Sequence, residues 1–247
     1  MNLIQILNRC NRENMKAIIL NSGMGTRLEE LTKNNPKSMV KLDDNTTIFS
    51  RTLSILSKFD IDEYIITTGY LHEVLEKYAL SEFENLNFRF VHNPVYDKTN
   101  YIKSIDLISE IDDDIILLHG DLVFTEDVAG KVIESDKSCV VVDSTIPIPK
   151  DDFKAKIEDN QVKYIGVDYF EDDAVACQPF YKLKSDDWKM WKNKIREFCD
   201  NDNMNVYAEN AFNSISDKLI IQPLDLKGLL CMEVDTKEDL KKVKEIL

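Results

Sequence analysis

Four charged side chains in this sequence stand where they could act on a phosphate chain. Arg27 follows the run Gly23-Met24-Gly25-Thr26, and Lys37 lies further along the same stretch. A guanidinium matches phosphate oxygens through its planar fork, and a lysine places a compact charge beside them. Asp121 and Asp235 each follow an apolar run, and Mg²⁺ typically takes one or two carboxylates beside phosphates and water. These residues predict chemistry on phosphates, with Arg27 and Lys37 as catalytic residues and Asp121 and Asp235 as ligands of Mg²⁺.

The glycine-rich run is placed to hold a nucleotide. It follows Ala17–Leu20, an apolar and partly β-branched run that is typical of a buried parallel strand. Its two glycines let the backbone turn sharply and approach a ligand closely. The run is not a Walker A loop, which needs a Gly-Lys pair, and it is not a dinucleotide fingerprint, because the sixth position is Leu28. We therefore expect the backbone amides of residues 22–26 to line a nucleotide.

The elements that must position these residues alternate along the first part of the chain. Strands are expected at 17–20, 63–67, 88–92, 114–119 and 138–142, and helices at 47–58, 71–78, 101–111 and 125–135. This alternation predicts an α/β fold with a Rossmann-like, doubly wound sheet that is mixed but mostly parallel. The site is then expected at the carboxyl ends of the strands.

The second half of the chain has a less regular pattern. Short strands are expected at 154–158, 161–167, 174–183, 219–222 and 229–234, and helices at 186–198, 206–216 and 236–247. We interpret residues 15–247 as a single domain whose second half forms the acceptor pocket. Residues 1–14 are interpreted as an N-terminal extension.

Composition disfavours several classes of partner. The net charge of −14 at pH 7 argues against nucleic acid or an anionic membrane surface as a partner. No apolar run approaches the roughly 20 residues that span a bilayer, so no membrane insertion is expected. Five dispersed cysteines without a C-x-x-C pattern favour a reducing, cytoplasmic location and argue against structural zinc. The oligomeric state is left open.

Residues 15–247 resemble the cytidylyltransferases of the CTP:phosphocholine type, which are relatives of the sugar-1-phosphate nucleotidyltransferases. The segments that carry the resemblance are KAIILNSGMGTRL, NNPKSMV, ITTGYL, HNPVYDKTNYIKSI, LLHGDLVF and MEVDTKEDL. The resemblance implies a Mg²⁺-dependent enzyme that joins CTP to a small phosphorylated acceptor and releases pyrophosphate. It assigns the phosphates to Arg27 and Lys37 and the metal to Asp121 and Asp235. The nucleotide contacts that we expect are Leu20, Asn21, Ser22, Gly23, Gly25, Thr26, Gly69, Tyr70, Asn100 and Ser104.

Three departures from that family bear on specificity. Asn21-Ser22 stands where the family usually has two alanines, which adds polar groups beside the base, and the aspartate segment reads HGDLVF. The chain also lacks the Glu-Lys-Pro segment that sugar-1-phosphate enzymes use around their sugar. That last departure favours a small non-sugar acceptor.

The acceptor is expected to bear an amine, as phosphocholine does. Such a cation would be held by aromatic faces and a carboxylate, for which Tyr181 and Glu209 are the candidates. Lys154 or Lys156 could hold the acceptor's phosphate or phosphonate. Two alternatives stay open: a sugar-1-phosphate nucleotidyltransferase, and a non-catalytic nucleotide-binding regulatory domain on the same fold.

Overall fold

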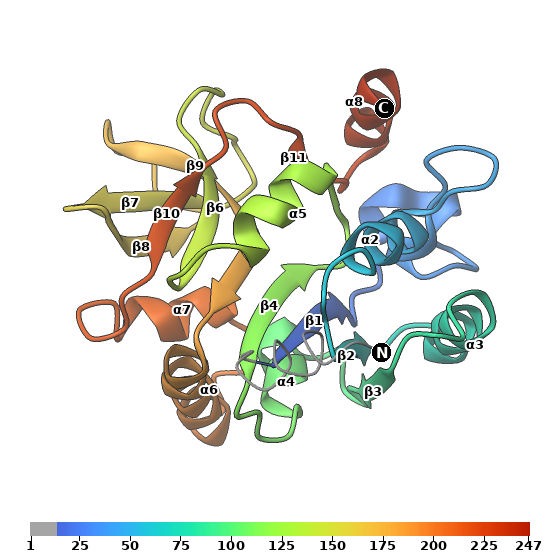
Figure 1. The fold of residues 1–247 in the computed structure, drawn as a ribbon, viewed down its shortest axis with the longest axis horizontal. Coiled ribbons are helices and arrows are strands. Elements are labelled where there is room, and N and C mark those ends of the chain that lie inside the picture. Colours follow the sequence, from blue (N-terminus) through green and yellow to red (C-terminus); the bar gives the residue numbers. More distant parts are fainter. Residues whose placement is uncertain (1–13) are drawn as a thin grey trace, which may run out of the picture.

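Four parallel strands form the part of the sheet that supports the glycine-rich run. The computed structural model describes residues 14–247, so the expected extension at residues 1–14 lies outside the described residues except for Asn14. Strand β1 (Met15–Asn21) pairs in parallel with β2 (Glu63–Thr68) and with β4 (Asp114–His119), and β2 pairs in parallel with β3 (Phe88–His92). Figure 1 shows β1 and β4 side by side near the centre of the molecule.

The second half of the chain extends this sheet with antiparallel pairings. The long strand β9 (Ala174–Leu183) runs antiparallel to β4 and to β6 (Cys139–Asp143). Strands β7 (Lys154–Glu158) and β8 (Gln161–Gly166) form a hairpin that joins β9. The main path runs β10-β6-β9-β4-β1-β2-β3, which confirms the predicted Rossmann-like, mixed sheet.

Strand β10 (Gln222–Asp225) lies later in the chain than the expected strand at 219–222. All four of its residues are half-buried, so the alternation that marks a strand is missing. It forms the edge of the sheet, where the missing N–H of Pro223 is tolerated. Leu219 and Ile221 are buried without belonging to a strand, so the strand that their apolar character predicted at 219–222 is wrong.

Helices cover both faces of the sheet (Figure 1). One face carries α4 (Tyr101–Asp106), α6 (Ser185–Asp200) and α7 (Ala208–Asn213), and the other carries α2 (Ile48–Leu56), α3 (His72–Glu82) and α5 (Glu126–Ile133). Each face of the sheet has its own hydrophobic core, and β1 contributes side chains to both: Ile18 points to one face and Ile19 to the other.

A small second sheet lies beside the site. Strand β5 (Leu122–Phe124), which the sequence did not predict, pairs antiparallel with β11 (Cys231–Glu233). The closing helix α8 (Lys237–Ile246) begins with the expected capping box between Thr236 and Asp239. Two short 3₁₀ helices, η1 (Thr26–Leu31) and η2 (Lys37–Met39), complete this region.

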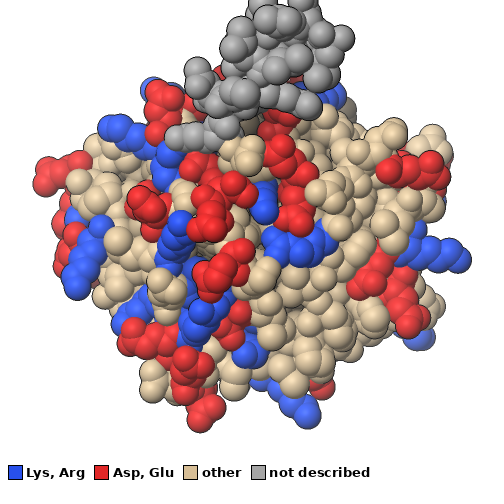
Figure 2. Space-filling model, turned by 60° about the horizontal axis from the view of Figure 1, so that its bottom comes forward, with Lys and Arg blue, Asp and Glu red and all other residues tan. Residues whose placement is uncertain are grey.

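On the face drawn in Figure 2, acidic and basic side chains are interspersed, and no continuous basic patch is visible. Among residues 14–247, no helix combines the length and the apolar character that crossing a membrane requires.

Candidate active site

One cavity of about 550 Å³ opens at the carboxyl ends of β1 and β4. This is the edge at which a doubly wound sheet presents its site. The cavity is lined by the glycine-rich run, the loop that follows β3, the residues that follow β4, and segments around residues 152, 207 and 233.

The pairing of β5 with β11 brings the two predicted metal ligands together. Leu122 lies opposite Glu233, and the backbone N–H of Val234 donates to the carbonyl of Asp121 at 3.0 Å. Asp121 and Asp235, which are far apart in the sequence, therefore flank this short ladder. Both carboxylates line the cavity.

The ammonium of Lys37 lies between these two carboxylates. It contacts Oδ2 of Asp121 and Oδ1 of Asp235, and the Arg27 guanidinium lies 2.7 Å from Oδ1 of Asp235. The Lys37 side chain is largely buried, whereas that of Arg27 is 60% exposed. Burial acts to lower the pKa of Lys37, but the charges of the two aspartates outweigh burial and raise it above its usual value. Lys37 is therefore a cation held between two carboxylates, whereas Arg27 makes one ion pair and stays largely exposed.

Gly25 explains why Lys37 can reach this place. Its φ of 63° lies in the left-handed region, and a Cβ there would lie 2.8 Å from Cβ of Lys37. The Thr32 hydroxyl donates to the Gly25 carbonyl at 2.9 Å and closes the loop. The glycine therefore serves both the turn and the close packing of Lys37. Gly23 differs, because a Cβ there would meet nothing within 4 Å.

The carboxylates suit a hard divalent cation. Oδ1 of Asp121 is buried and receives no hydrogen bond from any residue in the described part of the chain. Burial acts to raise the pKa of Asp121, but the charges of Lys37 and His119 together with the hydrogen bond from Lys37 outweigh burial and hold the pKa below its usual value. Ionised carboxylate oxygens are the ligands that Mg²⁺ prefers. Asp121 and Asp235 thus fit Mg²⁺, and Lys37 contacts the same pair of carboxylates.

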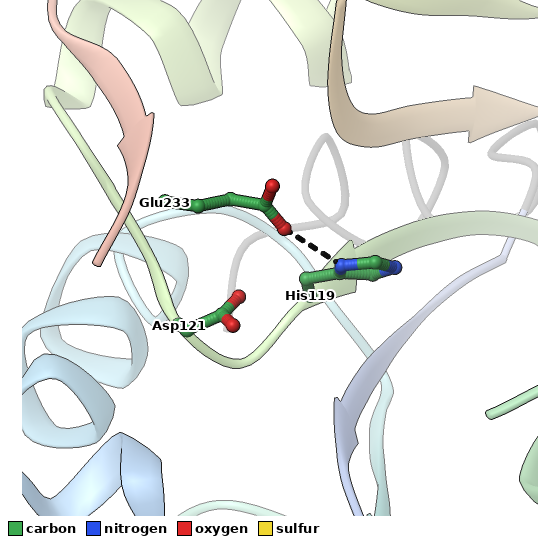
Figure 3. Close-up of side chains that lie close together, drawn as sticks. All are labelled: His119, Asp121 and Glu233. Carbon is green, nitrogen blue, oxygen red and sulfur yellow. Dashed lines mark hydrogen bonds and ion pairs between the residues drawn. The ribbon is translucent and has the colours of Figure 1, made fainter. Parts of the chain in front are cut away.

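A second polar pair lies next to Asp121. Nδ1 of His119 and Oε1 of Glu233 are 2.9 Å apart, as Figure 3 shows. His119 is two residues before Asp121, and Glu233 is two residues before Asp235. Burial, followed by the charge of Asp121, raises the pKa of Glu233 to about 7. Burial acts to lower the pKa of His119, but the hydrogen bond to Glu233 and the charges of the surrounding carboxylates together outweigh burial, so the net shift of the pKa is upward.

Aromatic rings form the wall beyond this pair. The ring of Tyr101 meets His119 edge-on with centroids 4.6 Å apart, and the rings of Phe153 and Tyr207 are 5.1 Å apart. All three rings line the cavity together with Asp152. This end of the cavity therefore combines apolar faces with carboxylates.

Most of the predicted nucleotide contacts also line this cavity, and we call this set of residues its nucleotide end. These are Leu20, Asn21, Ser22, Gly23, Gly25, Thr26, Asn100 and Ser104. Gly69 and Tyr70 are not among the lining residues; they lie behind them. A Cβ on Gly69 would lie 2.5 Å from the carbonyl of Ser22, and the ring of Tyr70 packs on that of Tyr96. Both therefore support the nucleotide end from outside the cavity.

The predicted acceptor contacts do not line the cavity, which corrects their expected placement. Lys154 is buried, and its ammonium donates to the carbonyls of Lys150 and Val167. Lys156 pairs with Glu158 at 2.7 Å.

The other two predicted acceptor contacts form a buried pair. Tyr181 and Glu209 are both buried, and Tyr181 donates to Glu209 at 2.8 Å. Glu209 also accepts from Tyr101. Its contribution to the cavity is therefore to hold the Tyr101 ring.

Some of the residues that the sequence analysis missed had a usable signal. In a strand, residues two apart share a face, so the H-x-D and E-x-D spacings could have placed His119 beside Asp121 and Glu233 beside Asp235. The loop that follows β3 could have been found as another strand end, and it contributes Asn93, Tyr96, Asp97, Lys98 and Thr99. Asp152, Phe153, Asn205 and Tyr207 had no such signal.

Known proteins resemble this chain in sequence. The CMP-5'-(3-aminopropyl)phosphonate synthase of Streptomyces rubellomurinus is 29% identical over 53% of this chain and 21% of its own length. The CTP:phosphoglutamine cytidylyltransferase of Campylobacter jejuni is 33% identical over 52% of each protein. The chain thus spans about a fifth and about half of these two relatives. The choline-phosphate cytidylyltransferase of Streptococcus pneumoniae is 28% identical over 94% of this chain and 98% of its own length.

Comparison of structures supports the same fold. The CTP:phosphocholine cytidylyltransferase of Streptococcus pneumoniae superposes with a TM-score of 0.76 at 21% identity, over 94% of this chain and 99% of that one. The sequence profile described as "Nucleotidyl transferase" matches residues 16–151, which is more than half of the chain. The chain therefore belongs to the nucleotidyl transferase family.

Proposed function

We propose that this protein transfers the CMP group of CTP to a small phosphorylated or phosphonate acceptor that bears an amine, and releases pyrophosphate. The observation that carries the proposal is the contact of Lys37 with both Asp121 and Asp235 at the centre of one cavity. The glycine-rich loop and a group of aromatic rings with carboxylates line the same cavity. The names of three relatives supply the base, because each includes a cytidine nucleotide or a cytidylyltransferase activity.

The reaction needs little covalent help from the protein. An oxygen of the acceptor's phosphate or phosphonate attacks the α-phosphorus of CTP, a new P–O bond forms, and the bond from the α-phosphorus to the bridging oxygen breaks. The electron pair leaves with pyrophosphate. Because the nucleophile is already an anion, no general base is required, and positioning and charge neutralisation carry the catalysis.

Lys37 and Arg27 have different tasks in this proposal. Lys37 is held rigidly, so it can bridge the α-phosphate and the acceptor's anionic group at a fixed place. Arg27 is exposed and can close over the β- and γ-phosphates, where its fork would neutralise the leaving group. Mg²⁺, held by Asp121 and Asp235, would supply further charge neutralisation on the phosphates.

The test is pyrophosphate release with Mg²⁺ across the four NTPs. Each is combined with phosphocholine, phosphoethanolamine, 2-aminoethylphosphonate and glucose-1-phosphate. We expect release with CTP and an amine-bearing acceptor, and none after EDTA treatment. Release with a sugar phosphate would favour a sugar-1-phosphate nucleotidyltransferase. CTP binding without release on any acceptor would favour a non-catalytic nucleotide-binding domain and overturn the proposal.

A further inference from the structure

We propose that the acceptor end of the cavity selects a primary ammonium over a quaternary one, with Glu233 and Asp152 accepting its N–H donors. This inference rests on the proposed function and narrows its acceptor. A primary and a trimethylated ammonium carry the same charge, so the selection must come from hydrogen bonds and from the shape of the pocket.

Three carboxylates converge at this end, and two of them have oxygens available. Oxygens of Asp152, Glu233 and Asp235 lie within 4.8 Å of one another. Asp235 uses Oδ1 for both Lys37 and Arg27, and it is one of the two carboxylates that we assign to the metal. Glu233 uses Oε1 for His119, and no residue between 14 and 247 donates to its Oε2. Asp152 is half-buried and has no hydrogen-bond or ion-pair partner among these same residues. Oε2 of Glu233 and both carboxylate oxygens of Asp152 thus remain for a ligand.

His119 fixes the direction in which Glu233 offers its free oxygen. The imidazole extends from the end of β4 and meets the carboxylate that extends from β11, as Figure 3 shows. One carboxylate oxygen faces the ring, and the other points away from it. Because His119 itself is buried against Tyr101, the carboxylate cannot turn without losing this hydrogen bond. His119 is therefore a positioning residue in this proposal.

A trimethylammonium group matches this pocket poorly. It has no N–H to donate, so the carboxylates would lose water without receiving a hydrogen bond, and an unmade hydrogen bond of this kind is costly. Quaternary ammonium groups are instead held by aromatic cages, in which tryptophan is the best ring. Both tryptophans of this chain, Trp188 and Trp191, are buried in the core. The rings of Phe153 and Tyr207 meet edge to face, so part of their surface is in contact with each other and is not available to a ligand.

The experiment is a methylation series on one acceptor. The kcat/KM for pyrophosphate release with CTP and Mg²⁺ is measured for phosphoethanolamine, its N-methyl and N,N-dimethyl derivatives, and phosphocholine. The pair of 2-aminoethylphosphonate and its N-trimethyl analogue is measured in parallel, so that a preference for P–C over P–O linkage is separated from the effect at nitrogen. We expect kcat/KM to fall with each methyl group, by at least tenfold from the first acceptor to the last.

Variants test whether the two carboxylates cause the preference. Glu233→Gln and Asp152→Asn keep the shape of each side chain, and each should move the ratio of primary to quaternary acceptor towards one. Glu245→Gln, a change at an exposed carboxylate outside the cavity, should leave the ratio unchanged. Thermal melting verifies that each variant folds. The methylation series on the wild-type protein tests the preference for a primary ammonium even if a variant fails to fold.

The outcomes separate this inference from the proposed function. A quaternary acceptor that is used as well as, or better than, the primary one overturns the inference and leaves cytidylyl transfer intact. A preference that both variants leave unchanged overturns the assignment to Glu233 and Asp152. Absence of pyrophosphate with all acceptors, while CTP still binds, overturns the proposed function and this inference with it.

Discussion

The two ends of the cavity are built in different ways. The nucleotide end consists mainly of residues from one stretch of chain, between Leu20 and Arg27, whose path passes through the left-handed region at Gly25. The acceptor end consists of side chains that come from separate strands and loops, such as His119, Phe153 and Glu233. A single substitution can therefore change the chemistry of the acceptor end, whereas the nucleotide end depends on the path of the chain.

Lys37 stands where the two ends meet, and its removal should have the largest effect. Lys37→Ala is expected to lower kcat roughly 10²–10³-fold, as the loss of a preorganised charge at a developing charge does. CTP should still bind, because the backbone of the glycine-rich run remains. The measurement is pyrophosphate release together with CTP binding by calorimetry.

The matched control is Lys41→Ala, which removes an exposed lysine of the same stretch whose ammonium donates to the carbonyl of Asp44. It should keep full activity. If Lys37→Ala abolished CTP binding and the control did not, Lys37 would belong to the nucleotide end alone. Its assignment to both ends of the cavity would then be wrong.

The acceptor end should also depend on a buried network behind it. Tyr181→Phe removes one of the two phenol donors to Glu209, so it leaves a buried carboxylate underpaired. We expect the free energy of unfolding to fall by about 1–3 kcal/mol, while kcat/KM changes less than threefold. Denaturant unfolding measures the first quantity.

The control for this network is Tyr164→Phe, which removes a phenol donor to Asp168 at an exposed site. Its effect should stay within about 0.5 kcal/mol. A large loss of activity in Tyr181→Phe without loss of stability would mean that Tyr181 contacts the acceptor after all.

The same contrast explains which parts of the molecule the sequence predicted. The parallel strands and the glycine-rich run were predictable because their signals are local: a continuous apolar run, then glycines, then a cation. Strand β5 was missed because three residues are too few to show a period. Helix α4 ends at Asp106, earlier than expected. Ile108 and Ile111 are buried beyond its end, so the apolar pattern that predicted the helix continues past it.

The acceptor end was predicted less well for a physical reason. Strand β9 is buried on both faces over most of its length, so alternation does not reveal which way Tyr181 points. Phe153 lines the cavity, whereas its neighbour Lys154 turns to backbone carbonyls. Residue type predicted that a cation pocket would hold aromatics and carboxylates, but only the tertiary structure selects which ones.

The two glycines of the nucleotide end should respond differently to the same substitution. Gly25→Ala should cost about 1–2 kcal/mol of stability, because an L-residue is strained in the left-handed region, and it should lower kcat because the new Cβ displaces Lys37. Gly23→Ala should leave stability within about 0.5 kcal/mol, since its Cβ meets nothing. Thermal melts and CTP titrations distinguish the two. Equal destabilisation by both changes would contradict the different roles assigned here.

The smallest effect is expected at the mouth of the acceptor end. Tyr207 is 36% exposed there, and a cation–π contact at an exposed site contributes about 0.5–1 kcal/mol. Tyr207→Leu should therefore raise the KM for the acceptor by roughly two- to fivefold, with kcat and the KM for CTP unchanged. Tyr207→Phe keeps the ring and should match the wild type. A rise in the KM for CTP in Tyr207→Leu would show that the two ends are not independent, because a ring that contacts only the acceptor cannot change the affinity for the nucleotide.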